Sequence, residues 1–305
     1  MNRIIMTAGD ISGINLFLIL KTVHNYPSIK FSITIHREIL ERGSEFFRLD
    51  IPDNIDCINP DIVPRSFTPG SDTDFTKEYA ALSLIKAVGM IKEDTHPLIT
   101  MPLNKKSTSM YIKGFGGHTE YLGRCFDSSE SMILYSRRIS VCPATTHIPI
   151  DDVIDTVNRD LLLRHLGNID SFFREYMGKR PRIAALCFNP HCSDNGLIAQ
   201  HDKNLKSIID DLNEYDIEGP VSSDTAFLPE RMKRTDVYLC MYHDQALIPF
   251  KIYSFEDGIN ITAGLPFLRV SPDHGPAIDI VHRQDEINTL SLENCIEFIE
   301  KRALK

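Results

Sequence analysis

The sequence predicts an α/β protein. Short apolar runs rich in β-branched residues alternate with segments whose apolar residues recur at helical spacing, and this alternation is typical of sheets covered by helices. Several apolar runs end in polar residues, and open α/β sheets bind ligands at the carboxyl ends of their strands. With 305 residues, 42% of them hydrophobic, the chain is long enough for one large α/β unit or two smaller domains.

The first part of the chain predicts three strands, at 3–7, 31–36 and 97–103, and three helices, at 16–26, 37–47 and 76–92, the last capped at Asp74 or Thr76. Residues 60–71, rich in Pro, Ser, Asp and Gly, are expected to form a surface loop. The turn after the first strand holds Gly9 and Asp10. It could present backbone N–H groups to an anion at a helix N-terminus, but it also suits an ordinary βα turn.

The rest of the chain predicts further strands and helices. We expect strands at 131–135 and 139–141, as a hairpin or in succession, then at 182–188, near 219–227 and at 237–242, with helices at 159–177, 202–212 and 293–304. Two glycines at 116 and 117 precede His118, Thr119 and Glu120 at the expected start of another helix. They would let the backbone approach a ligand closely, or they form a hinge before a capped helix.

Three histidines each follow an apolar strand-like run by a few residues: His147 in CPATTH, His191 in CFNPH and His243 in CMYHD. If these strands belong to one parallel sheet, the three imidazoles emerge at its carboxyl edge. Three neutral imidazoles can bind a divalent ion and leave a position open for substrate. Their separation along the chain matches no local metal motif, and a single histidine is more often a structural hydrogen-bonding residue.

The segment that follows His243 carries groups suited to a small anionic ligand. Lys251, Asn260 and Arg269 supply an ammonium, an amide and a guanidinium, and turn-forming residues lie between them. Next comes DHGPAIDI, residues 273–280. Its His274, Gly275 and Asp279 could contact the adenosine half of a nucleotide at the start of a helix-like run, and an ordinary helix cap is the alternative.

Charge and cysteine content exclude several classes of protein. The net charge of -9 and the lack of a basic block argue against nucleic-acid binding. Seven scattered cysteines without a CxxC pair suit free thiols in a reducing cytoplasm. The N-terminus does not resemble a signal peptide, and no apolar stretch reaches the roughly 18 residues of a membrane span. We therefore expect a soluble cytoplasmic protein.

The motifs, taken in order, resemble those of the 4-hydroxythreonine-4-phosphate dehydrogenases of pyridoxal phosphate synthesis, which are relatives of the isocitrate and isopropylmalate dehydrogenases. The resemblance runs from Thr7 to Asp279 through TAGDISGI, TMPLNK, GGHTEY, ATTHIPI, NPH, SSDTAF, MYHDQALIPFK, GINITAGLPFLR and DHGPAIDI. It implies two α/β/α lobes with the active site in the cleft between them. We expect residues 1–117 plus 262–305 to form the cofactor lobe, and residues 118–261 the lobe that binds metal and forms the dimer.

The resemblance also implies roles for single residues. It assigns the metal ligands to His147, His191 and His243, substrate binding to His118, Thr119, Lys251, Asn260 and Arg269, and catalysis to Lys251 and Asp224. Cofactor contacts fall on His274, Gly275, Asp279, Gly9 and Asp10. The cofactors are NAD or NADP and one divalent ion, Zn, Mg or Co, and the protein is expected to be a homodimer with active sites at the interface.

The implied reaction is the metal-dependent NAD(P)-linked oxidation and decarboxylation of 4-phosphohydroxy-L-threonine to 3-amino-2-oxopropyl phosphate, in pyridoxine 5'-phosphate synthesis. The sequence departs from the family pattern in the first turn, at Ile11, Ser12 and Asn15, and at Leu197, where the family has histidine. These departures leave open the same chemistry on a four-carbon sugar-acid 4-phosphate or a dihydrodiol carboxylate. They also leave open a non-catalytic relative that binds metal or nucleotide.

Overall fold

The computed structural model describes residues 2–304, without the side chain of Asn195. The chain divides into two units, residues 1–128 with 265–305 (unit 1) and residues 129–264 (unit 2). The division therefore falls about eleven residues later in the chain than the sequence predicted at its first boundary and three residues later at its second. As a result, His118 and Thr119 belong to unit 1.

Unit 1 contains five parallel strands in the order β3-β2-β1-β4-β11. Its strands are β1 (Arg3–Thr7), β2 (Lys30–Thr34), β3 (Ile55–Cys57), β4 (Leu98–Ile99) and β11 (Arg269–Pro272). Its α-helices are α1 (Asn15–Thr22), α2 (Arg37–Phe47), α3 (Asp74–Glu93), α4 (Lys105–Thr108), α5 (His118–Cys125) and α12 (Leu290–Arg302). Short 3-10 turns lie at Val23–Asn25, Ile278–Ile280 and Gln284–Glu286.

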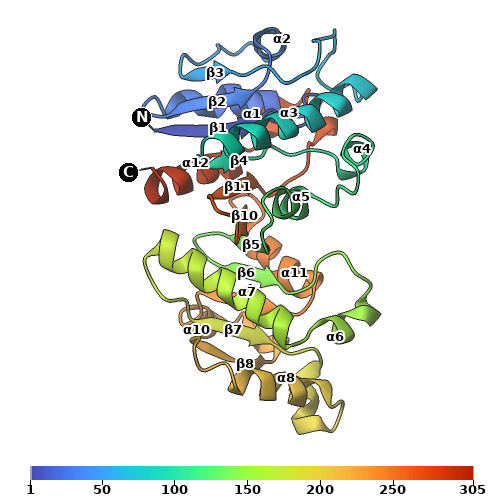
Figure 1. Ribbon diagram of the computed structural model, residues 1–305, viewed down its shortest axis with the longest axis vertical. Helices are drawn as coiled ribbons and strands as arrows, with labels where there is room; N and C mark the ends of the chain where they lie inside the picture. Colours follow the sequence, from blue (N-terminus) through green and yellow to red (C-terminus); the bar gives the residue numbers. More distant parts are fainter. Residues whose placement is uncertain (1, 305) are drawn as a thin grey trace. The chain divides into compact units, whose positions relative to one another are not determined.

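The helix α3 packs across the strands of unit 1, where Figure 1 shows it in front of β1. Its Leu84 and Val88 join Ile5 of β1 and Leu98 of β4 in a buried cluster. The cap of this helix is Thr73, one residue before Asp74 and three before Thr76, the two predicted candidates. Thr76 occupies the third helical position, where its hydroxyl and that of Thr73 each accept a hydrogen bond from the other residue's backbone N–H.

Unit 2 contains six strands in the order β10-β5-β6-β9-β7-β8. They are β5 (Ser131–Tyr135), β6 (Ser140–Pro143), β7 (Ile183–Leu186), β8 (Ile217–Val221), β9 (Val237–Cys240) and β10 (Ile259–Ala263). β5 and β6 are antiparallel, so of the two predicted alternatives the hairpin is correct. β10 is antiparallel to β5, whereas β6, β9, β7 and β8 are parallel.

The helices of unit 2 are α6 (Val153–Thr156), α7 (Arg159–Phe172), α8 (His201–Asp210), α9 (Ser223–Ala226), α10 (Pro229–Met232) and α11 (His243–Ser254). A π-helical turn, Phe173–Met177, extends α7, and 3-10 turns lie at Ile150–Asp152 (η2) and Pro190–Gly196 (η4). The helices α7 and α11 cover opposite faces of the sheet (Figure 1). His165 of α7 contacts Cys142 of β6, whereas Phe250 of α11 packs with Val141, the next residue along that strand.

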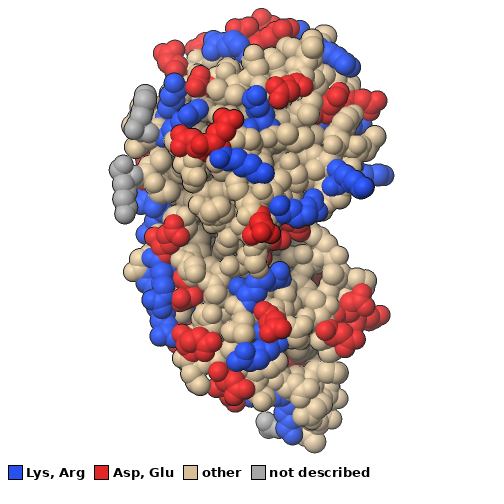
Figure 2. Space-filling view, viewed as in Figure 1, with Lys and Arg blue, Asp and Glu red and all other residues tan. Residues whose placement is uncertain are grey.

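Acidic and basic side chains are interspersed over the face of the molecule drawn in Figure 2. Among residues 2–304, no helix has both the length and the apolar composition that crossing a membrane requires.

Candidate active site

The strands that precede the three predicted metal ligands are neighbours in unit 2. β9 lies between β6 and β7 and is parallel to both. His147 follows β6, His191 follows β7, and His243 is the first residue of α11 directly after β9. The three imidazoles therefore follow the carboxyl ends of adjacent parallel strands, where α/β sheets bind ligands.

The structure brings two of these histidines together, and the third lies beside an aspartate. The rings of His147 and His243 lie with centroids 5.9 Å apart at an interplanar angle of 42°. His191 Nδ1 lies 3.8 Å from Asp224 Oδ2, the carboxylate predicted to be catalytic. Among the residues described, no three or more His, Cys, Asp or Glu side chains are close enough to hold one ion, so the structure does not bring all three imidazoles to a common point.

Two carboxylates lie beside these histidines, as is typical of metal ligands. His243 Nδ1 lies 2.6 Å from Asp244 Oδ1, so an N–H at Nδ1 donates to the carboxylate and Nε2 is left as the ligand atom. A ligating histidine typically donates its other N–H to a carboxylate in this way. Asp224 is suited to the same role beside His191. A hydrogen bond from Ser222 and the neighbouring His191 lower the pKa of Asp224, which is therefore ionised at neutral pH.

The loops that bear the histidines are tied together by a buried amide that the sequence reasoning missed. Gln245 Oε1 accepts from the backbone N–H of Met241 after β9 at 2.6 Å. Its Nε2 donates to the carbonyl of Cys187 after β7 and to Ser223 Oγ, both at 2.7 Å. Thr145 Oγ1 donates to the carbonyl of Met241 at 2.7 Å. This bond joins the segment after β6 to the same network. The only sequence signal was the position of Gln245 in the polar cluster after β9.

Three of the five predicted substrate-binding residues lie in unit 1. His118 and Thr119 begin α5, and Arg269 begins β11. Arg269 is only 2% exposed, and its Nε donates to Thr100 Oγ1 at 3.0 Å. Burial lowers the pKa of Arg269 to about 10, so the guanidinium stays charged at neutral pH.

His118 lies near both Arg269 and a second cation, Lys105. Burial lowers the pKa of His118 well below its usual range, and the positive charges of Arg269 and Lys105 lower it further. Its Nε2 is buried, with no hydrogen-bond partner in the part of the chain that the structure describes. A neutral imidazole beside two cations is suited to bind an anion, so Lys105 belongs with the predicted residues.

Gly117 lies beside both Lys105 and Glu120. A Cβ at this position would lie 3.6 Å from Lys105 Nζ, an ordinary contact, and 2.7 Å from Glu120 Oε2. The Glu120 carboxylate is the end of a flexible side chain, so a side chain at residue 117 would require only that this carboxylate move.

The pKa of His118 gives a test by NMR. We expect its imidazole to remain neutral from pH 8 down to pH 6 in the ligand-free protein, because protonation would place a third positive charge in a buried site. Below about pH 6.5 His118 binds a proton in the unfolded chain but not in the folded chain. The free energy of unfolding should therefore fall by up to about 1.4 kcal/mol for each unit that the pH is lowered. Ring ¹⁵N shifts, with His118→Gln for assignment, measure this. A ring that titrates near pH 6.5 would contradict it.

Lys251 and Asn260 lie in unit 2. Lys251 is on α11, with its Nζ 5.5 Å from the centre of the Phe255 ring. Asn260 is on β10, where it pairs with Leu134 of β5. Both residues therefore belong to the unit that carries the three histidines.

The predicted cofactor residues lie on two turns of unit 1 that touch each other. The backbone N–H of Ile14 donates to the carbonyl of Pro276 at 2.9 Å, and a Cβ on Gly13 would lie 2.0 Å from that carbonyl oxygen. Gly275 and Asp279 are exposed on the second turn. The helix-like run predicted after Gly275 is wrong: Ala277 has a left-handed backbone with φ 49°, and only a 3-10 turn, Ile278–Ile280, follows.

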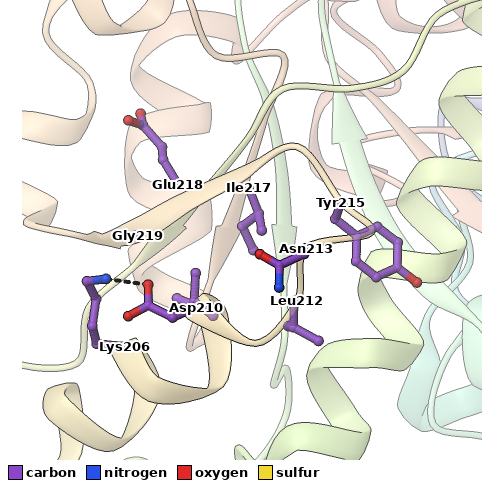
Figure 3. A pocket seen from close by; sticks show the side chains of 9 residues that line it. Lys206, Asp210, Leu212, Asn213, Tyr215, Ile217, Glu218 and Gly219 are labelled. Atoms are coloured by element: carbon purple, nitrogen blue, oxygen red, sulfur yellow. Dashed lines mark hydrogen bonds and ion pairs between the residues drawn. The ribbon is translucent and has the colours of Figure 1, made fainter.

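A polar cavity of about 340 Å³ lies elsewhere in unit 2, beside the start of β8 (Figure 3). Lys206 and Asp210 of α8 form an ion pair at its edge. It lies at the amino end of this strand, whereas the histidines follow carboxyl ends. The cavity therefore contributes nothing to the candidate site.

Comparison with known families decides the relationship. The model of the family described as "Pyridoxal phosphate biosynthetic protein PdxA" matches residues 19–299. The chain belongs to the PdxA family. A 4-hydroxythreonine-4-phosphate dehydrogenase from Sulfurihydrogenibium sp. is 34% identical over 98% of this chain and 97% of its own length. A D-threonate 4-phosphate dehydrogenase from Pectobacterium atrosepticum is 30% identical over 90% of this chain and 86% of its own length.

Solved structures agree with this assignment. The 4-hydroxythreonine-4-phosphate dehydrogenase of Klebsiella pneumoniae aligns with a TM-score of 0.84 and 28% identity, over 100% of this chain and 98% of the other. An isocitrate dehydrogenase from Methylococcus capsulatus shares the fold alone, with a TM-score of 0.50 and 12% identity over 98% and 83% of the two chains. The predicted family and fold class are confirmed.

In the first turn of this PdxA-family chain, Asp10, Ser12 and Asn15 make hydrogen bonds within the protein. The backbone N–H and the hydroxyl of Ser12 both donate to Asp10 Oδ1, at 3.0 and 2.6 Å. Asn15 Nδ2 donates to the carbonyls of Asp10 and of Pro102 after β4. Asp10 is 1% exposed, and burial raises its pKa. This carboxylate stabilises the turn and is not accessible from solvent.

Proposed function

We propose that this protein is a metal-dependent NAD(P)-linked dehydrogenase that converts 4-phosphohydroxy-L-threonine to 3-amino-2-oxopropyl phosphate in pyridoxine 5'-phosphate synthesis. The observation that carries the proposal is the family match over residues 19–299, together with the full-length relative of the same name. The side chains at the implied positions have the chemistry that the reaction needs.

The ion would be held by His147, His191 and His243, which follow β6, β7 and β9 and would have to draw closer together to share it. When bound, a divalent ion such as Zn, Mg or Co lowers the pKa of a coordinated hydroxyl, and this favours loss of hydride from the adjacent carbon. Asp244 holds His243 in the tautomer that presents Nε2. Asp224, beside His191, keeps that imidazole oriented and supplies a carboxylate for proton transfer.

The substrate carries a phosphate and a carboxylate. Their anionic oxygens would be bound by cationic or polar side chains, namely Arg269, Lys105, His118, Thr119, Lys251 and Asn260. With NAD or NADP bound, the secondary alcohol would lose hydride to the nicotinamide and a proton to the protein. The resulting β-keto acid would then lose CO2, and we assign to Lys251 the return of a proton to the enolate carbon.

For the cofactor, NAD or NADP, we assign His274, Gly275 and Asp279 as the contacts. Gly275 and Asp279 are exposed, and a Cβ on Gly275 would meet no atom within 4 Å, so a ligand can approach the backbone there. Gly9, whose φ is +62°, and the buried Asp10 shape the first turn, which in turn supports Pro276 of the second. Through these two turns the protein would bind the nucleotide and so orient its nicotinamide.

We also propose that the protein acts in the cytoplasm as a homodimer. The described chain has seven free cysteines, which suit a reducing compartment. Ile248 and Ile252 of α11 and Phe255 at its C-cap recur at helical spacing, and their side chains are 60%, 75% and 72% exposed. An exposed apolar stripe of this kind suits an isologous contact with a second copy. Sedimentation equilibrium measures the mass, and a monomer at micromolar concentration would contradict the proposal.

Substrate identity is tested by a panel of candidates with NAD or NADP and each of the three metals. We expect 4-phosphohydroxy-L-threonine to give the highest kcat/KM, measured as NAD(P)H absorbance. D-threonate 4-phosphate is the second candidate, favoured by the relative with that name, and it carries a hydroxyl where the first substrate carries an amine. A dihydrodiol carboxylate completes the panel. Faster turnover of the threonate would reassign the substrate, and no turnover of any would favour a non-catalytic relative.

A further inference from the structure

The turn that carries His191 has an unusual backbone. His191, Cys192, Ser193 and Asp194 all have left-handed conformations, with φ of 51°, 51°, 62° and 44°. Residues other than glycine rarely adopt this conformation, and then usually singly. A run of four such residues persists only where the surrounding structure holds it.

One buried carboxylate holds this turn. Asp202 lies on α8 and is 1% exposed. Its Oδ1 accepts from the backbone N–H of Phe188 at 2.7 Å. Its Oδ2 accepts from the backbone N–H of Asn189 at 3.2 Å, from Asn189 Nδ2 at 2.9 Å and from Ser193 Oγ at 2.5 Å.

These four donors lie on both sides of His191. Phe188 and Asn189 connect β7 to the turn, and Ser193, which is fully buried, lies two residues past His191. The carboxylate therefore fixes both flanks of the residue whose imidazole faces Asp224. None of the four bonds involves the imidazole itself.

We propose that Asp202 is a positioning residue that holds the left-handed turn and so places His191 for binding a divalent ion. The role in metal binding rests on the proposed function, in which His191 is a ligand. Outer-shell partners of metal ligands typically change metal affinity by about 10- to 100-fold. Asp202 does not contact the His191 imidazole and acts on its position through the backbone of the turn.

The sharpest test is Asp202→Asn, which keeps the size of the side chain. An amide places an NH2 group toward either Phe188 N–H or the donors of Asn189, and these backbone and amide donors cannot become acceptors. We expect cobalt affinity, followed by the visible absorption of the bound ion, to fall by about 10-fold or more with an altered spectrum. Without metal, the amides of Phe188 and Asn189 should exchange faster with deuterium.

Two further variants complete the experiment. Asp211→Asn makes the same chemical change just after α8 at an exposed position and should match the parent protein in both measurements. Ser193→Ala removes one of the four bonds, so we expect a smaller loss of cobalt affinity with the fold intact, and it replaces Asp202→Asn if that variant does not fold.

The outcomes separate this proposal from the proposed function. Parent-like exchange and cobalt binding in Asp202→Asn, or in Ser193→Ala if only that variant folds, would overturn the positioning role. A parent protein that binds no cobalt would overturn the metal-dependent function, and the exchange of the Phe188 and Asn189 amides would then still decide whether Asp202 holds the turn.

Discussion

Alanine in place of His243 is expected to remove metal binding and catalysis while leaving the fold intact. His243 begins α11 with a side chain 36% exposed, and alanine is a good helix former, so the substitution should cost little stability. It deletes one imidazole of the closest histidine pair, whose rings lie 5.9 Å apart. Since loss of an outer-shell partner alone costs about 10- to 100-fold in metal affinity or activity, loss of a ligand should cost more than about 100-fold.

Metal content after dialysis and kcat/KM with added metal measure this effect. The matched control is His201→Ala, which removes an exposed imidazole at the start of α8 in the same unit. It should retain both metal and activity. If the His243→Ala protein instead kept the affinity of the parent for the ion, the ion would have to bind elsewhere. The histidines that follow β6, β7 and β9 would then not form the metal site.

The sequence predicts those features of the site that depend on local patterns, namely the buried strands and the polar residues at their ends. Val237 to Tyr242 forms a short apolar run without a helical stripe, which indicates a buried strand, and the polar residues that follow mark the strand end. The same logic located His147 and His191. The adjacency of the three strands followed only from the structure, because strand order depends on contacts between residues far apart in the chain.

The elements that sequence reasoning missed depend on tertiary contacts. The strand β3 has only three residues, each partly exposed, so it carries no apolar run. The run after Gly275 has the apolar residues of a helix, but the left-handed Ala277 stops helix formation at its start. Gln245 bonds to Cys187, which lies 58 residues away in the chain. Asp202 bonds to Phe188 and Asn189, which lie 14 and 13 residues away. No local sequence pattern predicts such partners.

Methionine in place of Arg269 is expected to abolish productive substrate binding with little effect on the stability of the protein. The guanidinium is almost fully buried, and the fall of its pKa from 12.5 to about 10 corresponds to a cost of roughly 3 kcal/mol for keeping the charge there. Keeping this charge buried does not stabilise the fold, but it favours binding of an anionic substrate. A desolvated guanidinium binds carboxylate or phosphate oxygens strongly and through two parallel bonds.

Removing one partner of a buried charge pair costs about 2–5 kcal/mol, so kcat/KM should fall by roughly 30- to 5000-fold, mostly through KM. The melting temperature should change only modestly, since methionine fills similar space without a buried charge but forfeits the hydrogen bonds to Thr100. Arg302→Met, at the exposed end of α12, controls for loss of a cation. An unchanged KM in Arg269→Met would show that the anion binds without β11. A large fall in melting temperature with an unchanged KM would instead make Arg269 a structural residue.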